Sequence, residues 1–328
     1  MRVFITGITG FVGGHLTELL AAEGGHTVAG LSRHAAWPAQ LAHLRAVANL
    51  YPAELADGPA VERVLREVRP DWVFHLAGYA NPGKSFREPA ACWADNLAAT
   101  QSLYDAVVRS EVPCRVLFAS TGLVYGDPDG PGPVTESAVL KPASPYAASK
   151  AAADLMSYQY TRSPGLDIVR VRLFNQIGPR QPADYAVANF ARQIAAAEAG
   201  KQEPVVRTGD LSAERDLTDV RDMVAACRLL IERGAAGEVY NAGRGCTWKI
   251  ADVLAALVAQ ARVPVEVQSQ PEPNRKADTA VTRADPTKLR RATGWEPRYQ
   301  LDRTLSDVLG YWRHRRLRRA GATTSGSH

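Results

Sequence analysis

The stretch from Val3 to Gly13 reads Val-Phe-Ile-Thr-Gly-Ile-Thr-Gly-Phe-Val-Gly, an apolar run that ends in regularly spaced glycines. A buried strand, a glycine turn and a helix in this order form the phosphate-binding start of a dinucleotide site. The first glycine permits the tight turn, the second lets the backbone approach the pyrophosphate, and the third lets the helix pack on the sheet. The sequence therefore predicts a dinucleotide site built from Gly7, Thr9, Gly10, Phe11, Val12 and Gly13.

Short apolar runs alternate with amphipathic stretches through the first half of the chain, whereas the pattern loosens after residue 173. Alternation of this kind predicts an α/β fold, a Rossmann-type doubly wound parallel sheet with a smaller, interleaved C-terminal lobe. We expect residues 1–172 to form the cofactor-binding domain, with 216–243 returning to it, and 173–328 to form the substrate-binding domain. The expected strands are 3–6, 27–31, 72–76, 115–119 and 167–173, and the expected helices are 11–23, 60–68, 89–110, 144–162, 186–199, 219–233, 248–262 and 301–316.

The composition is that of an ordinary globular protein, with 46% hydrophobic and 22% charged residues. No apolar run is long enough to span a membrane, and a strand follows Met1 almost directly, so we expect a cytoplasmic protein without a leader. The net charge of +5 is concentrated at 313–319, which favours a solvated helix end before a disordered tail over a nucleic-acid site. Metal and disulfide sites are not expected, because the cysteines are scattered at Cys92, Cys114, Cys227 and Cys246.

The second expected strand ends in Ser32-Arg33-His34, with no carboxylate to hold the 2′-hydroxyl of NAD. An arginine in this place accommodates a 2′-phosphate, so NADP(H) is favoured, with Ser32 and Arg33 as phosphate contacts, and NAD(H) is the alternative. Glu54 and Asp57 either face the adenine or are solvated loop acids. Further cofactor contacts are predicted at Leu55 and at the end of the fourth strand, at Leu76, Ala77 and Gly78.

Tyr146 and Lys150 stand four residues apart in an expected helix, so a phenol and an ammonium share one face. A cation beside a phenol lowers the pKa of the phenol, which suits proton transfer at a carbon that bears oxygen. A solvated surface contact is the alternative for such a pair when it stands alone.

The residues named above, together with Asn96 and Ser120-Thr121, resemble the extended short-chain dehydrogenase/reductase family of nucleotide-sugar epimerases, dehydratases and reductases over essentially the whole chain. The resemblance implies that Thr121 binds the reacting sugar oxygen, that Tyr146 is the acid/base, and that Lys150 anchors the cofactor ribose and acidifies the tyrosine. It also implies cofactor contacts at Asn96 and Phe174. Without the family, Thr121 would be interpreted as a strand-end cap.

The residues after Thr121 decide between branches of the family. A 4,6-dehydratase needs an acid and a base there, and Gly122 and Leu123 can transfer no proton. A 4-keto reductase that consumes NADPH and a redox-neutral NAD-dependent 4-epimerase remain, and Arg33 favours the reductase. A non-catalytic cofactor-binding regulatory subunit is a further alternative. The presence of all three predicted catalytic residues, Thr121, Tyr146 and Lys150, argues against it.

The second half most resembles the reductases of GDP-linked 4-keto-6-deoxymannose, in segments 172–179, 201–204, 215–222 and 237–241. That resemblance implies a nucleoside-diphosphate sugar as substrate, oriented by Asn175 and held at its pyrophosphate by Arg215 and Arg275. Departures from the pattern occur at Gln176, Arg180 and Lys276. The predicted substrate-binding residues are Thr121, Gly122, Asn175, Arg180, Arg215 and Arg275.

Members of the family commonly form dimers, which implies a homodimer through a four-helix bundle of the helices at 89–110 and 144–162. The small residues Ala147, Ala148, Ala151 and Ala152 would permit close helix approach, or else face the sheet.

Overall fold

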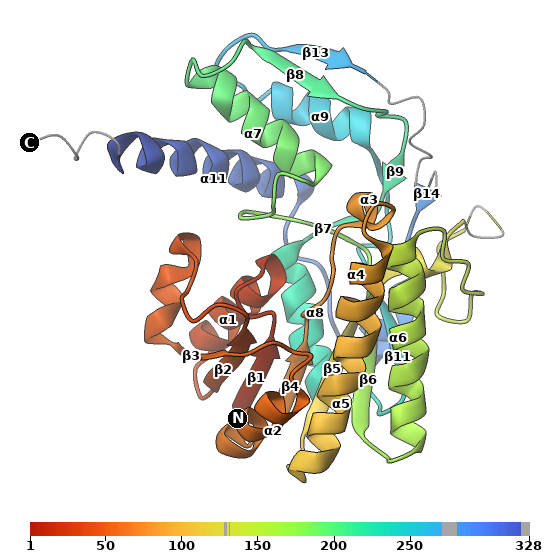
Figure 1. Cartoon of the computed structure of the whole chain (residues 1–328). Coiled ribbons are helices and arrows are strands. Elements are labelled where there is room, and N and C mark those ends of the chain that lie inside the picture. Colours follow the sequence, from red (N-terminus) through yellow and green to blue (C-terminus); the bar gives the residue numbers. More distant parts are fainter. Residues whose placement is uncertain (128–129, 131, 271–280, 323–328) are drawn as a thin grey trace, which may run out of the picture.

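A seven-stranded parallel sheet forms the centre of the computed structural model, which describes residues 1–127, 130, 132–270 and 281–322. Its strand order, β11-β6-β5-β4-β1-β2-β3, reverses direction between β1 and β4, as in a doubly wound sheet (Figure 1). The predicted fold class is confirmed. The strands are β1 (Arg2–Thr6), β2 (Thr27–Ser32), β3 (Ala48–Pro52), β4 (Trp72–His75), β5 (Arg115–Thr121), β6 (Asp167–Leu173) and β11 (Val239–Ala242).

Helices cover both faces of this sheet, so its strands are buried on both sides. Val3 and Ile5 pack in one core and Phe4 packs in the other, and all three are fully buried. The first core receives α1 (Phe11–Glu23), α8 (Val220–Arg233) and Leu289 of α10 (Thr287–Thr293). The second core receives α2 (Gly58–Val68), α5 (Ala99–Ser110) and α6 (Pro145–Arg162).

The single helix predicted over 89–110 is instead three segments in line. α4 (Pro89–Trp93) passes through a π-helical turn, η2 (Ala94–Ala98), into α5. A π turn accommodates one extra residue and rotates the side chains that follow it, and such turns are frequent at functional sites. Helical structure thus covers the predicted range 89–110, and the π turn within it was not predicted.

A second lobe packs around its own core above the carboxyl ends of the strands (Figure 1). Its helices α7 (Ala186–Glu198), α9 (Ile250–Val258) and α11 (Leu301–Ala322) pack with the paired strands β8 (Val205–Thr208) and β13 (Glu266–Ser269). The helix predicted at 248–262 is shorter, since α9 ends at Val258. It begins at Ile250 because Trp248 and Lys249 form β12 against β9. The remaining elements are η1 (Ala39–Ala46), α3 (Pro82–Ser85), η3 (Gly122–Tyr125), β7 (Asn175–Ile177), β9 (Glu214–Arg215), β10 (Leu217–Asp219), β12 (Trp248–Lys249) and β14 (Val281–Thr282).

The two lobes are interleaved along the chain. After β7 to β10, α8 and β11 return to the sheet, and Leu289 and Trp295 then join its first core. The predicted domain boundaries stay a prediction. In the described part of the chain, no helix is long and apolar enough to cross a membrane, and no cluster of three or more His, Cys, Asp or Glu side chains could hold a metal ion. The predicted tail beyond 322 lies outside the described residues.

Candidate active site

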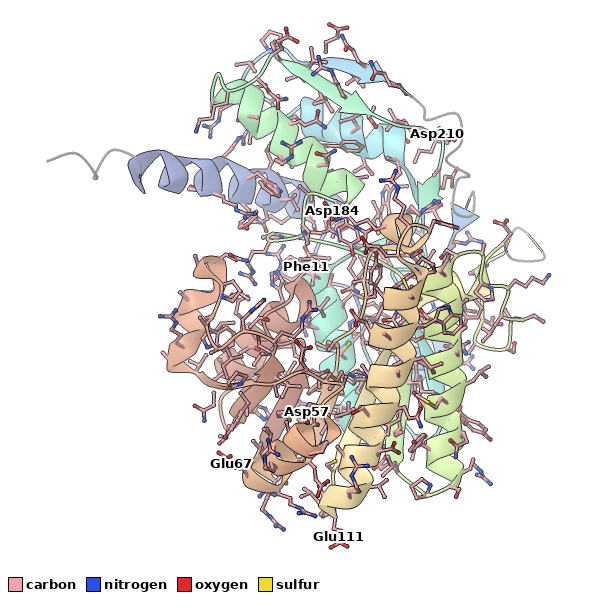
Figure 2. The ribbon with its side chains drawn as sticks, in the orientation of Figure 1. Phe11, Asp57, Glu67, Glu111, Asp184 and Asp210 are labelled. Carbon is pink, nitrogen blue, oxygen red and sulfur yellow. The ribbon has the colours of Figure 1, made fainter. Side chains whose placement is uncertain are left out.

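A cavity of about 1960 Å³ lies between the two lobes, at the carboxyl ends of the strands. Figure 2 shows Phe11 at the upper edge of the sheet lobe and Asp184 at the base of the second lobe, and both line the cavity. The cavity brings together nearly all predicted cofactor residues: Gly7, Thr9, Gly10, Phe11, Val12, Gly13, Ser32, Arg33, Glu54, Leu55, Leu76, Ala77, Gly78, Tyr146, Lys150 and Phe174.

The glycine loop has the geometry that a pyrophosphate site needs. Gly7 has a φ of 73°, and a Cβ there would lie 2.9 Å from the backbone nitrogen of Ala77. A Cβ on Gly13 would lie 2.2 Å from the carbonyl oxygen of Gly7, so only glycine fits. Gly10 is the N-cap of α1 and supplies no side-chain cap, which leaves the first backbone N–H groups of the helix to an anion.

The end of β2 carries hydroxyls and a guanidinium. The Ser32 hydroxyl is buried, accepts a hydrogen bond of 3.2 Å from the His34 backbone nitrogen and lies 3.4 Å from the Thr9 hydroxyl. Arg33 is exposed and lines the cavity, as Glu54 does. Asp57 instead caps α2, where its carboxylate accepts a hydrogen bond from the Ala60 backbone nitrogen.

Asn96 is the predicted cofactor residue that does not line the cavity. It is 1% exposed and packs behind Gly78, where a Cβ would lie 2.5 Å from Asn96 Oδ1. Its Nδ2 donates a hydrogen bond of 3.0 Å to the Ser149 hydroxyl. In this structure Asn96 supports the strand end that faces the cavity.

Thr121, Tyr146 and Lys150 meet at the floor of the cavity, where β5 ends and α6 begins. The Ser144 side chain caps α6 and fixes its first turn, from which Tyr146 and Lys150 project. The Thr121 and Tyr146 side chains are hydrogen-bonded to each other, and Thr121 Oγ1 also accepts a hydrogen bond from the Leu123 backbone nitrogen. Thr121 therefore acts as the strand-end cap considered from the sequence and also contacts Tyr146, while its predicted bond to the reacting sugar oxygen stays a prediction.

The pKa of Tyr146 differs from the predicted one. Burial, followed by the neighbouring Tyr185, raises the pKa of Tyr146, and the hydrogen bond from Thr121 offsets only part of the increase. Lys150 does not contribute to this shift, since its Nζ donates a hydrogen bond of 2.5 Å to the carbonyl oxygen of Ala119 and burial lowers the pKa of Lys150 to about 8. The expected acidification is wrong for this structure, because the cost of burying a phenolate exceeds every favourable interaction. With its pKa raised, the phenol of Tyr146 carries its proton at neutral pH.

A buried ion cluster holds α6 against the sheet. Asp154, which is fully buried, accepts hydrogen bonds of 2.7 Å from Arg170 and 2.9 Å from Arg172 of β6. Arg172 also donates to the hydroxyl of Tyr125, which in turn donates to Asn241 of β11. The helix that carries Tyr146 is thus fixed to two neighbouring strands.

The predicted substrate residues fall into three groups. Thr121, Gly122, Asn175 and Arg215 line the cavity. Arg180 does not, because its guanidinium turns to α1 and binds the Glu18 carboxylate at 2.6 Å. Arg275 lies outside the described residues.

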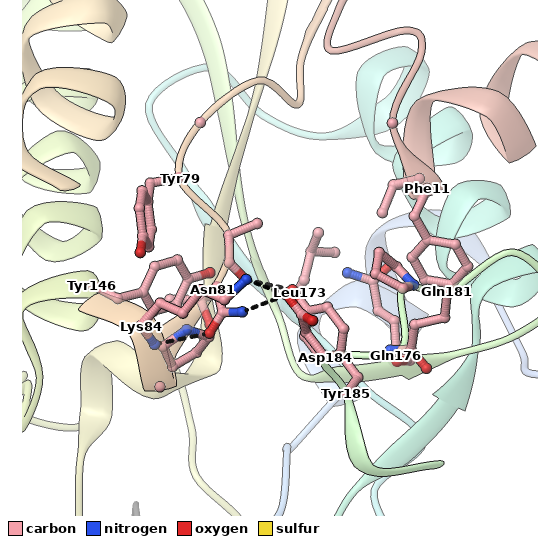
Figure 3. Close-up of a pocket in the computed structure, with 18 of the residues that line it drawn as sticks. Phe11, Tyr79, Asn81, Lys84, Tyr146, Leu173, Gln176, Gln181, Asp184 and Tyr185 are labelled. Atoms are coloured by element: carbon pink, nitrogen blue, oxygen red, sulfur yellow. Dashed lines mark hydrogen bonds and ion pairs between the residues drawn. The ribbon is translucent and has the colours of Figure 1, made fainter. Parts of the chain in front are cut away.

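The cavity also contains residues that the sequence did not suggest. Asn81 and Lys84 follow β4, and Asp184 and Tyr185 precede α7, so the members of this group come from segments 100 residues apart (Figure 3). Neither segment carries a local signal of chemistry, since the contacts arise only when the lobes pack together. Arg207 of β8 is a further cationic lining residue.

Comparisons with known proteins agree with this geometry. A family model described as GDP-mannose 4,6 dehydratase matches residues 4–308. The chain is 34% identical over 315 residues to a GDP-6-deoxy-D-mannose reductase of Pseudomonas aeruginosa, across 96% of this chain and 98% of that protein.

Two solved structures extend the similarity to the whole fold. RMD from Pseudomonas aeruginosa complexed with NADPH has a TM-score of 0.83 at 32% identity, covering 96% of this chain and 99% of that one. The UDP-glucose 4-epimerase of Thermus thermophilus complexed with NAD has a TM-score of 0.84 at 31% identity, covering 95% and 99%. Both lobes and the cavity between them are included in these matches.

Proposed function

Because the chain belongs to the GDP-mannose 4,6-dehydratase family of extended short-chain dehydrogenases/reductases, we propose that it reduces a nucleotide-linked 4-keto-6-deoxy sugar with NADPH. GDP is the favoured nucleotide, since the reductase of Pseudomonas aeruginosa named above acts on a GDP-linked sugar. The observation that carries the proposal is the hydrogen bond between the Tyr146 and Thr121 side chains at the cavity, with no proton-transferring side chain at 122 or 123.

Position 122 supports a reductase over a dehydratase also on steric grounds. A Cβ on Gly122 would lie 2.9 Å from the ring of Phe174, so an acidic side chain here would require the ring to move. Leu123 lines the cavity with an apolar side chain. The dehydration of a sugar needs a second acid/base pair, which these two positions do not supply.

The mechanism follows from the three side chains at the cavity floor. NADPH, when bound, would supply the hydride that reduces carbon 4 of the ketosugar. Tyr146 donates its phenolic proton to the carbonyl oxygen, and the Thr121 hydroxyl offers that oxygen a second hydrogen bond as negative charge develops. Lys150 would hold the cofactor ribose when the cofactor is bound, and the glycine loop with the N-terminus of α1 would hold the pyrophosphate.

The redox-neutral 4-epimerase remains the second candidate, because an NAD-bound epimerase has a comparable structural similarity. An epimerase starts by removing a proton from the sugar hydroxyl, for which Tyr146 must be a phenolate. The raised pKa of Tyr146 disfavours that start and suits reduction.

The deciding experiment follows NADPH oxidation by absorbance with GDP-4-keto-6-deoxymannose, and with the dTDP- and UDP-linked ketosugars in parallel. Stoichiometric oxidation with one of them is the expected result, and it identifies the nucleotide. If none oxidises NADPH and the denatured protein releases NAD, the protein is an epimerase. The absence of both reductase and epimerase activity would support a regulatory subunit.

Arg33→Ala is expected to weaken NADPH binding by about 10- to 100-fold and to leave NADH binding unchanged, because a guanidinium at the end of β2 contacts only a 2′-phosphate. Titration of both cofactors by fluorescence measures the ratio. Arg69→Ala, at the exposed end of α2, serves as a control for the loss of a surface arginine. Equal weakening of both cofactors by Arg33→Ala would contradict NADP selectivity.

We further propose that the chain forms a homodimer through α4 to α6 and acts in the cytoplasm. Trp93 of α4 and Leu155 and Tyr158 of α6 are large apolar side chains that are exposed by 42 to 58%. Ala147 and Ala151 are buried within the subunit, so only the half-buried Ala148 and Ala152 remain available for close helix approach.

Leu155→Glu is expected to halve the mass in solution measured by light scattering, because two such carboxylates would be buried at a symmetric interface. Val267→Glu, at an equally apolar exposed site on β13, provides the control and should leave the mass unchanged. A wild-type protein that is monomeric at micromolar concentration would refute the dimer.

A further inference from the structure

A second polar cluster lies in the same cavity as Thr121, Tyr146 and Lys150, and it connects the two lobes. We name it the Asp184 cluster, and it consists of Asp184, Lys84 and Asn81. Lys84 Nζ lies 2.6 Å and Asn81 Nδ2 3.2 Å from the same oxygen of Asp184, Oδ2 (Figure 3). All three residues line the cavity, and the ion pair is about half exposed.

The orientation of these groups is determined by their own hydrogen bonds. Asn81 Oδ1 accepts a hydrogen bond of 3.0 Å from the Lys84 backbone nitrogen, so the amide must direct Nδ2 at Asp184. Both donors converge on Oδ2, and Oδ1 of Asp184 accepts no hydrogen bond from the described residues. The ammonium and the amide each retain further N–H donors. The cluster therefore offers one charged acceptor and several donors side by side.

The cluster lies next to the reacting centre. Tyr185 follows Asp184 and lines the cavity. Its hydroxyl donates a hydrogen bond to the carbonyl oxygen of Ala80, the residue before Asn81. Tyr185 is also close enough to Tyr146 to raise the pKa of that residue. A sugar whose carbon 4 faces Tyr146 consequently has the rest of its ring within reach of Asp184.

We propose that Asp184, Lys84 and Asn81 bind the neighbouring hydroxyls at carbons 2 and 3 of the hexose, an inference that rests on the proposed function. In a nucleotide-linked 4-keto-6-deoxy hexose, carbon 1 carries the phosphate, carbon 4 is the ketone and carbon 6 is a methyl group. Only the hydroxyls at carbons 2 and 3 remain. Each hydroxyl donates one hydrogen bond and accepts others, which the carboxylate, ammonium and amide complement.

Two other occupants fit the cluster less well. A phosphate would be repelled by the Asp184 carboxylate, and Arg215 and the helix N-terminus provide better sites for it. A contact that only fastens the two lobes would act equally on every ligand in the cavity.

The test compares a nucleoside diphosphate with its hexose conjugate by calorimetry in the presence of NADPH. The pairs are GDP with GDP-mannose, dTDP with dTDP-glucose, and UDP with UDP-glucose. For the accepted base, wild-type protein should bind the conjugate more tightly. Asp184→Asn should raise the dissociation constant of the conjugate by about 10- to 100-fold and change the dissociation constant of the bare diphosphate by less than about 2-fold.

A matched control separates loss of the contact from loss of a surface charge. Glu238 pairs with Lys288 at 2.6 Å, is exposed like Asp184 and does not line the cavity, so Glu238→Gln should leave both affinities unchanged. Lys84→Met tests the donor side of the cluster and should weaken the conjugate selectively as well. Melting temperatures verify that all variants fold.

Three outcomes would overturn the inference. Asp184→Asn could bind the conjugate as tightly as the wild type does, or it could lose affinity for the conjugate and for the diphosphate to the same extent. The third outcome is a wild-type protein that binds none of the conjugates more tightly than the corresponding diphosphate. The proposed function fails by a different measurement, the absence of NADPH oxidation with every ketosugar, so the two failures are distinguishable.

Discussion

Tyr146→Phe will lower kcat by about 10²- to 10⁴-fold and leave the dissociation constant of NADPH unchanged. The substitution removes the phenolic hydroxyl that donates the proton to the carbonyl oxygen in the proposed mechanism, and it keeps the ring that lines the cavity. Lys150 Nζ is hydrogen-bonded to the Ala119 carbonyl oxygen rather than to the phenol, so the cofactor side of the site should remain intact. Steady-state kinetics with the accepted ketosugar and a fluorescence titration of NADPH measure the two quantities.

Tyr160→Phe is the matched control, since it makes the same change on the same helix. The Tyr160 hydroxyl donates to Asp105 and does not line the cavity, so the turnover of this variant should equal that of the wild type. Full turnover by Tyr146→Phe would refute the acid role of Tyr146.

Asp154→Asn will reduce the free energy of unfolding by about 3 to 5 kcal/mol. The substitution preserves size but removes the charge that two guanidinium groups share, and Arg170 and Arg172 are 7% and 4% exposed. Two buried cations would then face each other without compensation, so the cost comes from the charges left behind rather than from a lost contact. Denaturation in urea, with activity assayed in parallel, measures the change.

The matched control is Asp167→Asn, which also neutralises an aspartate paired with an arginine. Asp167 binds Arg115 at 3.2 Å on the surface, where its side chain is 47% exposed, and such pairs contribute about 0 to 1 kcal/mol. Similar losses for the two variants would show that burial of the Asp154 cluster has no energetic weight.

The features that were predictable from the sequence are those that short segments determine by themselves. The glycines after β1 are needed for a local turn and a local close approach, and the Ser144 side chain caps α6 by accepting a hydrogen bond from the Ala147 backbone nitrogen three positions later. The phosphate loop and the start of α6 therefore follow from neighbouring residues. The strands β1 and β5 are mostly apolar runs buried on both faces, which makes them visible in the sequence.

The features that were missed depend on contacts between distant segments. Arg180 was placed with the substrate because of its position in a motif, yet the Glu18 carboxylate, 162 residues away, holds it outside the cavity. The direction of the pKa shift of Tyr146 depends on how deeply the packed lobes bury the phenol, which its spacing from Lys150 does not encode. The contact between Lys84 and Asp184 exists only because two loops meet across the cavity.

The glycine N-cap of α1 has a consequence for how long the protein survives. A serine or aspartate at this position would accept a hydrogen bond from the first backbone N–H groups of the helix, whereas Gly10 leaves these groups to a bound anion. A ligand that binds only the folded state stabilises it in proportion to the logarithm of its concentration over its dissociation constant. The abundance of the protein in a cell should therefore follow the supply of its dinucleotide, because chains without it unfold more often and are degraded first.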